Sequence, residues 1–189
     1  MKNNKPIKLS IFVAIPVSLA LQDKANEWEE KFRSKEYSTF NKIRWLDYEN
    51  LHLTLVPPWN ETEEGVLKIK SLLTPISNKK KGFKIKFDNI SYGPGKSSPS
   101  LIWASGEVPA QLTGLKASIE KTLKKKSEKR PFALHLTLGR FNPSEFKSFK
   151  CKDINEKILW EEKVSEFALM QSNLSPSGAQ YTLLDTFKL

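Results

Sequence analysis

The chain has 189 residues, of which 39% are hydrophobic, 28% charged and 11% aromatic. This length and composition predict one folded domain and exclude a chain that is disordered throughout. With 31 Lys and Arg against 21 Asp and Glu, the formal net charge is +10, which favours anionic partners such as nucleic acid, nucleotides or acidic membrane. The single cysteine, Cys151, excludes an intramolecular disulfide and a cysteine-rich metal site.

The N-terminal segment combines lysines at positions 2, 5 and 8 with an apolar stretch over residues 9–21, a pattern that also occurs in secretory signal peptides. The β-branched residues Ile11, Val13 and Ile15, followed by Pro16, fit a strand that ends at a turn better. No other stretch approaches the ~20 apolar residues of a membrane span. We therefore expect a cytoplasmic monomer that does not enter a membrane.

Hydrophobic periodicity predicts strands and helices along the whole chain. The expected strands are 8–15, 42–46, 50–56, 83–88, 101–107, 132–138, 163–172 and 180–187, and the expected helices are 17–35, 61–73 and 110–126. Pro57-Pro58 is expected to stop the third strand, and Thr62 or Asn60 to cap the second helix. Because the strands come mostly in pairs with helices between them, the pattern predicts an α+β fold with largely antiparallel sheets.

Both histidines of the chain lie in the same tetrapeptide, which is His52-Leu53-Thr54-Leu55 in one place and His135-Leu136-Thr137-Leu138 in the other. On a strand, alternate side chains point to opposite faces, so the leucines face a core while each histidine projects beside a threonine. The repetition indicates an internal duplication of about half the chain.

Matched titratable groups are what acid–base catalysis requires, although each histidine could also be a partly buried residue of an ordinary strand. A metal site is less well supported, because a third ligand with recognisable spacing is missing. No nucleophile elbow, P-loop or glycine-rich dinucleotide motif is present. Histidine titrates near ~6.5, so one imidazole can accept a proton while its partner donates one, as hydrolysis of a cyclic phosphodiester needs. Arg140 would add a bidentate donor for the phosphate.

These motifs resemble the 2H phosphoesterase superfamily, and most closely its RNA 2′,3′-cyclic phosphodiesterase branch, also described as bacterial 2′-5′ RNA ligase-like proteins. That family is marked by two H-x-[ST]-x motifs on facing strands. Further matches in the same order are Ile11-Phe12-Val13-Ala14, Ile43-Arg44-Trp45, Asn50-Leu51, Leu101-Ile102-Trp103, Arg130-Pro131-Phe132 and residues 172–181. The chain departs from the family at Val56-Pro57-Pro58-Trp59 and at Leu134, where relatives often have a Leu-Gly turn and a proline, respectively.

The resemblance implies a single domain over residues 1–189, made of two duplicated lobes with pseudo-two-fold symmetry. Two mainly antiparallel sheets would flank a central cleft, with helices outside and neither metal nor cofactor. It implies that His52 is the proton donor and His135 the proton acceptor, and that Thr54, Thr137 and Arg140 contact the phosphate. The implied substrate is RNA or a nucleotide ending in a 2′,3′-cyclic phosphate, which is opened to a 2′-phosphate.

Two alternative functions remain open. The same chemistry could act on a 2′-5′ linkage or a small cyclic nucleotide, or the fold could be a catalytically inactive RNA- or nucleotide-binding module. Stacking on a base is a possible role for Phe12, Trp45, Trp59 and Phe132. The lysine runs 79–81 and 124–126 could belong to an RNA path, but such runs more often form a solvated turn or helix end.

Overall fold

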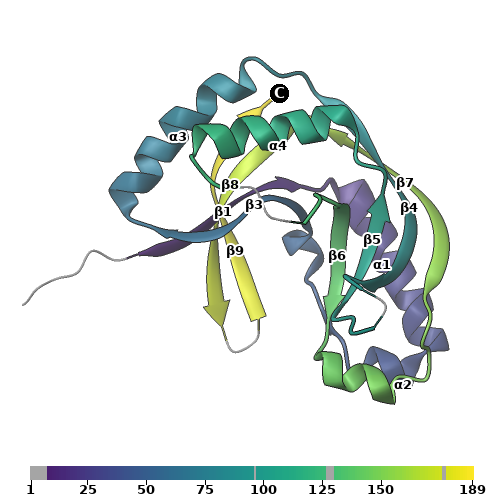
Figure 1. The fold of residues 1–189 in the computed structure, drawn as a ribbon. Helices are drawn as coiled ribbons and strands as arrows, with labels where there is room; N and C mark the ends of the chain where they lie inside the picture. The colour runs from purple at the N-terminus through teal and green to yellow at the C-terminus, as the bar shows by residue number, and fades with distance from the viewer. Residues whose placement is uncertain (1–7, 96, 127–129, 176–177) are drawn as a thin grey trace, which may run out of the picture.

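The computed structural model describes residues 8–95, 97–126, 130–175 and 178–189 (Figure 1). The strands are β1 (Leu9–Pro16), β2 (Arg44–Trp45), β3 (His52–Glu61), β4 (Phe83–Gly93), β5 (Leu101–Gly106), β6 (Leu134–Arg140), β7 (Asn155–Val164), β8 (Glu166–Ser175) and β9 (Gly178–Lys188). The α-helices are α1 (Leu19–Lys35), α2 (Tyr37–Phe40), α3 (Glu63–Ser77) and α4 (Ala110–Thr122), and short 3₁₀ helices are η1 (Tyr48–Asn50) and η2 (Pro143–Ser148).

The strands form two antiparallel sheets, with orders β3-β1-β8-β9 and β2-β6-β5-β4-β7. The two motif strands, β3 and β6, contact each other where the sheets meet. Helix α1 packs against β7 of the second sheet, while α3 and α4 contact β9 and β3 of the first (Figure 1). The predicted α+β fold with two mainly antiparallel sheets is confirmed.

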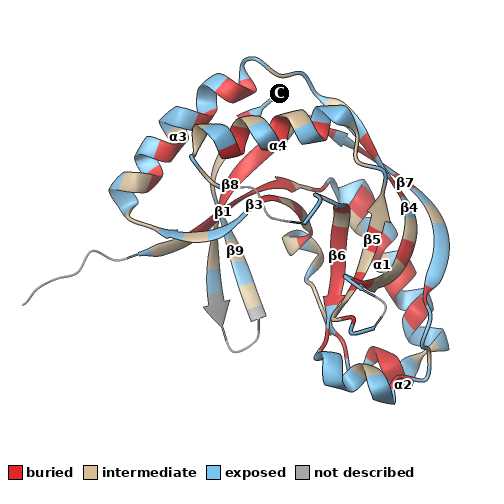
Figure 2. Ribbon diagram, in the orientation of Figure 1, coloured by how far each residue is buried: buried red, intermediate tan, exposed pale blue. Residues whose placement is uncertain are grey.

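Alternation along the motif strands places their leucines in the core. Leu53 and Leu136 are 1% and 0% exposed, and the other leucines of both motifs are buried with them. His52 and His135 lie on the opposite face and are only partly buried. Figure 2 shows the same division in α3 and α4, where buried and exposed residues alternate. Burial of the leucine face therefore determines which way each imidazole points.

The expectation that Pro57-Pro58 stops the third strand is wrong, because β3 continues through them to Glu61. Strand β3 is the outer strand of its sheet, so a residue without an N–H group loses no ladder hydrogen bond on the open side. The register with β1 also shifts here, from Val13 opposite Val56 to Ile11 opposite Trp59. An edge position and a bulge are the places where a strand accepts proline.

Several other boundaries differ from those expected. The strand expected at 42–46 shrinks to β2, because α2 and the turn after it occupy the preceding residues, and β7 was not predicted. Helix α3 begins at Glu63, two residues after the expected start, and Thr62, one of the two expected caps, accepts a hydrogen bond at Oγ1 from the Gly65 N–H at 3.1 Å. Residues 9–16 form a central strand of the first sheet. Among the described residues, no helix is long and apolar enough to cross a membrane.

Candidate active site

His52 is the first residue of β3, and its side chain is held by the backbone just before the strand. Its Nδ1 lies 2.7 Å from the carbonyl oxygen of Asn50. Because a carbonyl can only accept, Nδ1 carries the proton and Nε2 is left for a substrate. The ring packs against Phe12 of β1 and Tyr181 of β9, with centroid distances of 5.1 and 5.0 Å. The imidazole is thus fixed in one tautomer and wedged between two aromatic rings.

His135 repeats this arrangement on β6. Its Nδ1 lies 3.0 Å from the carbonyl oxygen of Ala133, again two residues before the histidine. The ring lies 5.0 Å from Trp103 of the adjacent strand β5, at the same 48° interplanar angle that Phe12 makes with His52. The two motifs therefore present equivalent imidazole edges from equivalent strand positions.

The structure brings the two histidines and Arg140 into one electrostatic environment. Burial lowers the pKa of His52 below its usual 6.5, the hydrogen bond to Asn50 opposes this effect, and the charges of Arg140 and His135 lower the pKa further. His52 is consequently neutral at neutral pH before a substrate binds. A phosphate placed beside it would favour the protonated ring and raise the pKa again.

A cavity of about 610 Å³ contains most of the predicted substrate-binding groups. Thr54, Thr137 and Arg140 line it together with His135. Hydroxyl and guanidinium donors around one imidazole form a site that suits a phosphate group. Four of the five residues singled out by the sequence line this cavity, and His52 lies on β3, which contacts β6.

Lys116 of α4 also lines this cavity and was not recognised in the sequence. Its Nζ donates to the carbonyl oxygen of Leu55 at 2.8 Å, forms a buried ion pair with Glu120, and lies 5.2 Å from the centre of the Phe132 ring. An (i, i+4) Lys–Glu pair normally lies on a solvated helix face, so the sequence carries no signal for this role. Within the described ranges, no three His, Cys, Asp or Glu side chains gather so that they could hold a metal ion.

The fold and the paired motifs agree with comparisons to known proteins. Residues 18–175 match the family model described as "2′-5′ RNA ligase superfamily". The chain belongs to this superfamily. An Archaeoglobus fulgidus protein named RNA 2′,3′-cyclic phosphodiesterase is 31% identical over 186 residues, covering 95% of this chain and 100% of that protein. One of the same name from Aquifex aeolicus is 27% identical, covering 87% and 90% of the two chains.

Solved structures extend the agreement to the fold. E. coli LigT, crystallised with 3′-AMP, has a TM-score of 0.76 and 23% identity, covering 97% of this chain and 99% of that one. Thermus thermophilus TT0787 has a TM-score of 0.74 and 24% identity, covering 96% and 98%. At this identity the likeness establishes the shared superfamily fold alone.

The aromatic residues expected near a base divide into two groups. Phe132 lines the cavity and Phe12 contacts His52. Trp45 stacks on Phe40 at 4.9 Å and lines a different pocket, and Trp59 lies under Lys125, 4.2 Å from the Nζ. Phe12 is 2% exposed, so Phe132 is the one of the four that lines the cavity beside His135.

The lysine runs lie away from the cavity. Lys79 and Lys80 line a hollow of about 440 Å³ between α3 and α4, together with Lys121. Lys124 follows the C-terminal end of α4 in a left-handed conformation, with a φ of 51°. Neither run supplies a residue that lines the cavity containing His135.

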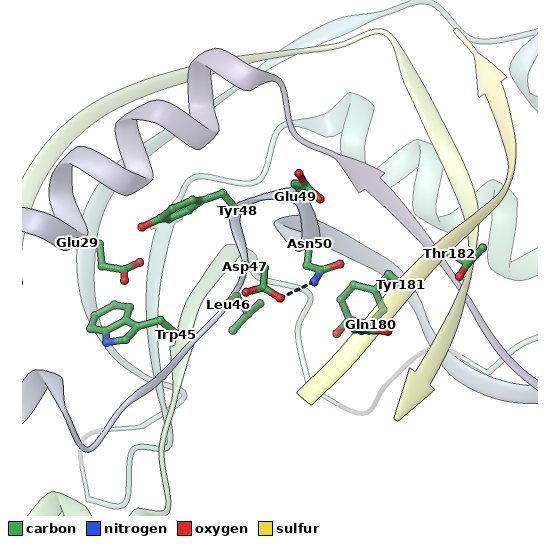
Figure 3. Close-up of a pocket in the computed structure, with 10 residues that line it drawn as sticks. All are labelled: Glu29, Trp45, Leu46, Asp47, Tyr48, Glu49, Asn50, Gln180, Tyr181 and Thr182. Atoms are coloured by element: carbon green, nitrogen blue, oxygen red, sulfur yellow. Dashed lines mark hydrogen bonds between the residues drawn. The ribbon is translucent and has the colours of Figure 1, made fainter. Parts of the chain in front are cut away.

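A second pocket, of about 670 Å³, lies close to His52. Figure 3 shows that its side chains come from α1, from residues 45–50 and from β9. Asn50 and Tyr181 belong to it and also contact His52. Glu29, Asp47 and Glu49 make this pocket acidic, in contrast to the cavity that contains Arg140.

Proposed function

We propose that this protein is a metal-independent RNA 2′,3′-cyclic phosphodiesterase, which opens a terminal cyclic phosphate to a 2′-phosphate. The observation that carries the proposal is the matched pair of imidazoles on β3 and β6, each held by a carbonyl two residues before it. Family membership and the relatives named RNA 2′,3′-cyclic phosphodiesterase support the same activity. The basic surface and the cavity lined by Arg140 suit an anionic RNA end.

The proposed reaction divides two proton transfers between the histidines. His135 Nε2 takes a proton from water as the water oxygen bonds to phosphorus. The bond from phosphorus to the 3′-oxygen breaks, and that oxygen receives the proton from His52 Nε2. The products are a 2′-phosphate and a 3′-hydroxyl, and the two rings exchange their proton with solvent before the next turnover.

The neighbouring groups would stabilise the charge that develops on the phosphate. Thr54 and Thr137 sit two residues beyond the histidines, on the same face of each strand. Their hydroxyls can donate to the non-bridging oxygens, and the guanidinium of Arg140 can pair with them bidentately. Since His52 is neutral in the free protein, the negative phosphate itself would supply the conditions under which this ring becomes an acid.

One experiment tests the proposal directly. An oligonucleotide ending in a 2′,3′-cyclic phosphate is incubated with the purified protein and an excess of chelator, and the product end is mapped by mass spectrometry and NMR. We expect a 2′-phosphate and no effect of the chelator. Loss of turnover on chelation, restored by zinc or manganese, would contradict metal independence. Binding without turnover would favour the RNA-binding module, and turnover of only a 2′-5′ linkage would favour that substrate.

The proposal includes a cytoplasmic monomer built from two duplicated lobes. The single cysteine, Cys151, is compatible with a reducing compartment. In support of duplication, the orders β3-β1-β8-β9 and β6-β5-β4-β7 place each motif strand beside the strand whose aromatic residue contacts its histidine. Light scattering at several concentrations tests the monomer, since a dimer would double the measured mass.

A further inference from the structure

A second basic pocket continues from the site beyond Arg140. This pocket has a volume of about 790 Å³, and Arg140 lines both it and the cavity containing His135. Its other charged lining residues are Lys42, Arg44 and Glu145. Arg140 thus borders both hollows, and cations predominate among the charged residues of the second one.

Arg44 is the direct neighbour of Arg140 across the β2–β6 ladder. Residues paired in this way have Cα atoms about 4.5–5.5 Å apart and side chains on the same face of the sheet. Both arginines are exposed, and among the described residues neither forms an ion pair with a carboxylate. Because like charges directly opposite each other repel, this pair is better accommodated when an anion lies between or beside the two groups.

The acidic residue of the pocket does not neutralise the pair. Ser148 Oγ donates mainly to the backbone carbonyl of Glu145 at 2.6 Å, lies 3.4 Å from its carboxylate, and accepts from Lys42 Nζ at 2.8 Å. Among the described residues, the Glu145 carboxylate forms no ion pair with Arg44 or Arg140. The positive charge of Arg44 and Arg140 remains available to a ligand.

The charges of the two pockets beside the site point to one direction for an RNA chain. The pocket next to His52 contains Asp47 and Glu49, which would repel a phosphate. The pocket next to Arg140 contains Lys42 and Arg44, which would attract one. An oligonucleotide whose terminal phosphate lies at the histidines would therefore continue over β2 and β6.

We propose that Arg44 binds the phosphodiester that precedes the terminal nucleotide, so that the enzyme prefers an oligonucleotide to a mononucleotide. This inference rests on the proposed function, because it takes the cyclic phosphate to lie between His52 and His135. In an RNA end, the 5′-oxygen of the last nucleotide carries the next phosphate. Arg140 would contact the terminal phosphate and Arg44 the one before it.

The test compares Arg44→Gln with the unmodified protein on three substrates. They are a mononucleoside 2′,3′-cyclic phosphate, a dinucleotide with the same end, and that dinucleotide with a neutral methylphosphonate linkage. We expect kcat/KM of the variant to fall about 10- to 100-fold on the charged dinucleotide, as for a lost charge-assisted hydrogen bond. The loss on the other two should stay within about threefold. An equal loss on all three substrates would overturn the proposal.

Matched controls separate a local contact from a general effect of charge. Lys80→Gln and Lys121→Gln each remove one positive charge from the hollow between α3 and α4, at the opposite end of the molecule from α2 and the β2 strand that follows it (Figure 1). These variants should leave the dinucleotide preference unchanged, and Arg44→Lys should retain part of it. The salt dependence of dinucleotide binding should become weaker for Arg44→Gln alone. If the control variants lose as much of the dinucleotide preference as Arg44→Gln does, the overall positive charge of the protein causes the preference and the proposal is overturned.

The outcomes for this inference and for the proposed function are distinguishable. If the unmodified protein cleaves none of the three substrates, the proposed function fails, whatever Arg44 does. Fluorescence anisotropy with a labelled dinucleotide then still measures the contact. Equal binding of the charged and methylphosphonate forms would overturn the role of Arg44 in that case as well. Thermal unfolding of each variant verifies that the exposed substitutions leave the fold intact.

Discussion

His52 and His135 occupy the same tetrapeptide, the same side of a motif strand and the same hydrogen bond to a carbonyl, but they differ in what surrounds them. Phe12 and Tyr181 enclose His52, and burial lowers its pKa. His135 contacts Trp103 and lines the cavity that holds Arg140. The repeated motif thus fixes the orientation of each ring, whereas burial among residues from other strands lowers the pKa of His52. Equivalent motifs can therefore serve opposite proton transfers.

The largest expected effect comes from removing either ring. We expect His52→Ala and His135→Ala each to lower kcat about 10²–10⁴-fold, the usual range for a general acid or base. The double variant should lose far less than the product of the single losses, because the residues act as a unit. Steady-state kinetics on a cyclic-phosphate oligonucleotide measures all three variants. Near-normal turnover in either single variant would end the case for paired catalysis.

A substrate whose leaving group needs no proton separates the two roles. With such a substrate the acid is dispensable, so His52→Ala should recover much of its rate while His135→Ala should not. Recovery by His135→Ala instead would reverse the assignment. The more buried ring, His52, would then be the base, and His135 the acid.

The second effect concerns the strand that carries His52. Lys116 reaches from α4 to the Leu55 carbonyl, and its ion pair with Glu120 is buried. We expect Lys116→Met to lower the free energy of unfolding by about 3–5 kcal/mol, because it removes one member of a buried ion pair. The double variant Lys116→Met/Glu120→Leu should regain most of that loss. Urea denaturation measures both, and an equal loss in single and double variants would contradict the explanation.

The pH dependence of the reaction sharpens the difference between the histidines. If His52 donates its proton, it must be protonated, so kcat/KM should fall about tenfold per pH unit above its lowered pKa, which lies below 6.5. The corresponding limb of kcat should lie at higher pH, because bound phosphate raises that pKa. A rise of kcat/KM through the same pH range, followed by a plateau, would identify His52 as the base.

The sequence predicts those features that depend on local alternation or on a repeated motif. The leucine faces of β3 and β6, and the outward position of the motif histidines opposite them, follow from such patterns. Strand β7 was missed because it is an edge strand rich in charge, whose Glu161 pairs with Lys86 of β4 at 2.9 Å. Its buried positions are Trp160, Glu162 and Val164, so a charged residue interrupts the apolar alternation that is typical of strands.

Tertiary context accounts for the remaining differences. Pro57-Pro58 looks like a strand stop until the edge position and bulge of β3 are known. Lys116 looks like a surface residue until α4 is placed against β3. The acidic pocket is assembled from α1, residues 45–50 and β9, segments that are far apart in the chain. The sequence of each of these segments gives no indication that the others lie beside it.

The smallest expected effect tests the acidic side of the site. Burial raises the pKa of Glu29 from 4.5 to about 7, opposed by the hydrogen bond it accepts from Tyr48 and by the charge of Arg33. Between these pH values the folded chain holds a proton that the unfolded chain has released. The contribution of Glu29 to stability is therefore complete below pH 4.5 and is lost as the pH rises through about 7.

Glu29→Gln keeps an oxygen that can accept from Tyr48 but cannot become charged. The unfolding free energy of the variant relative to the unmodified protein should therefore rise between pH 5.5 and pH 8.5, as measured by urea denaturation at both values. Glu30→Gln on the same helix serves as the control, because Glu30 is exposed and pairs with Arg33 at 3.0 Å. A difference for Glu29→Gln that is constant with pH would show that its carboxyl is not held protonated by burial. The asymmetry between the acidic and basic sides of the site would then reflect three ionised carboxylates, Glu29 among them, throughout the neutral range.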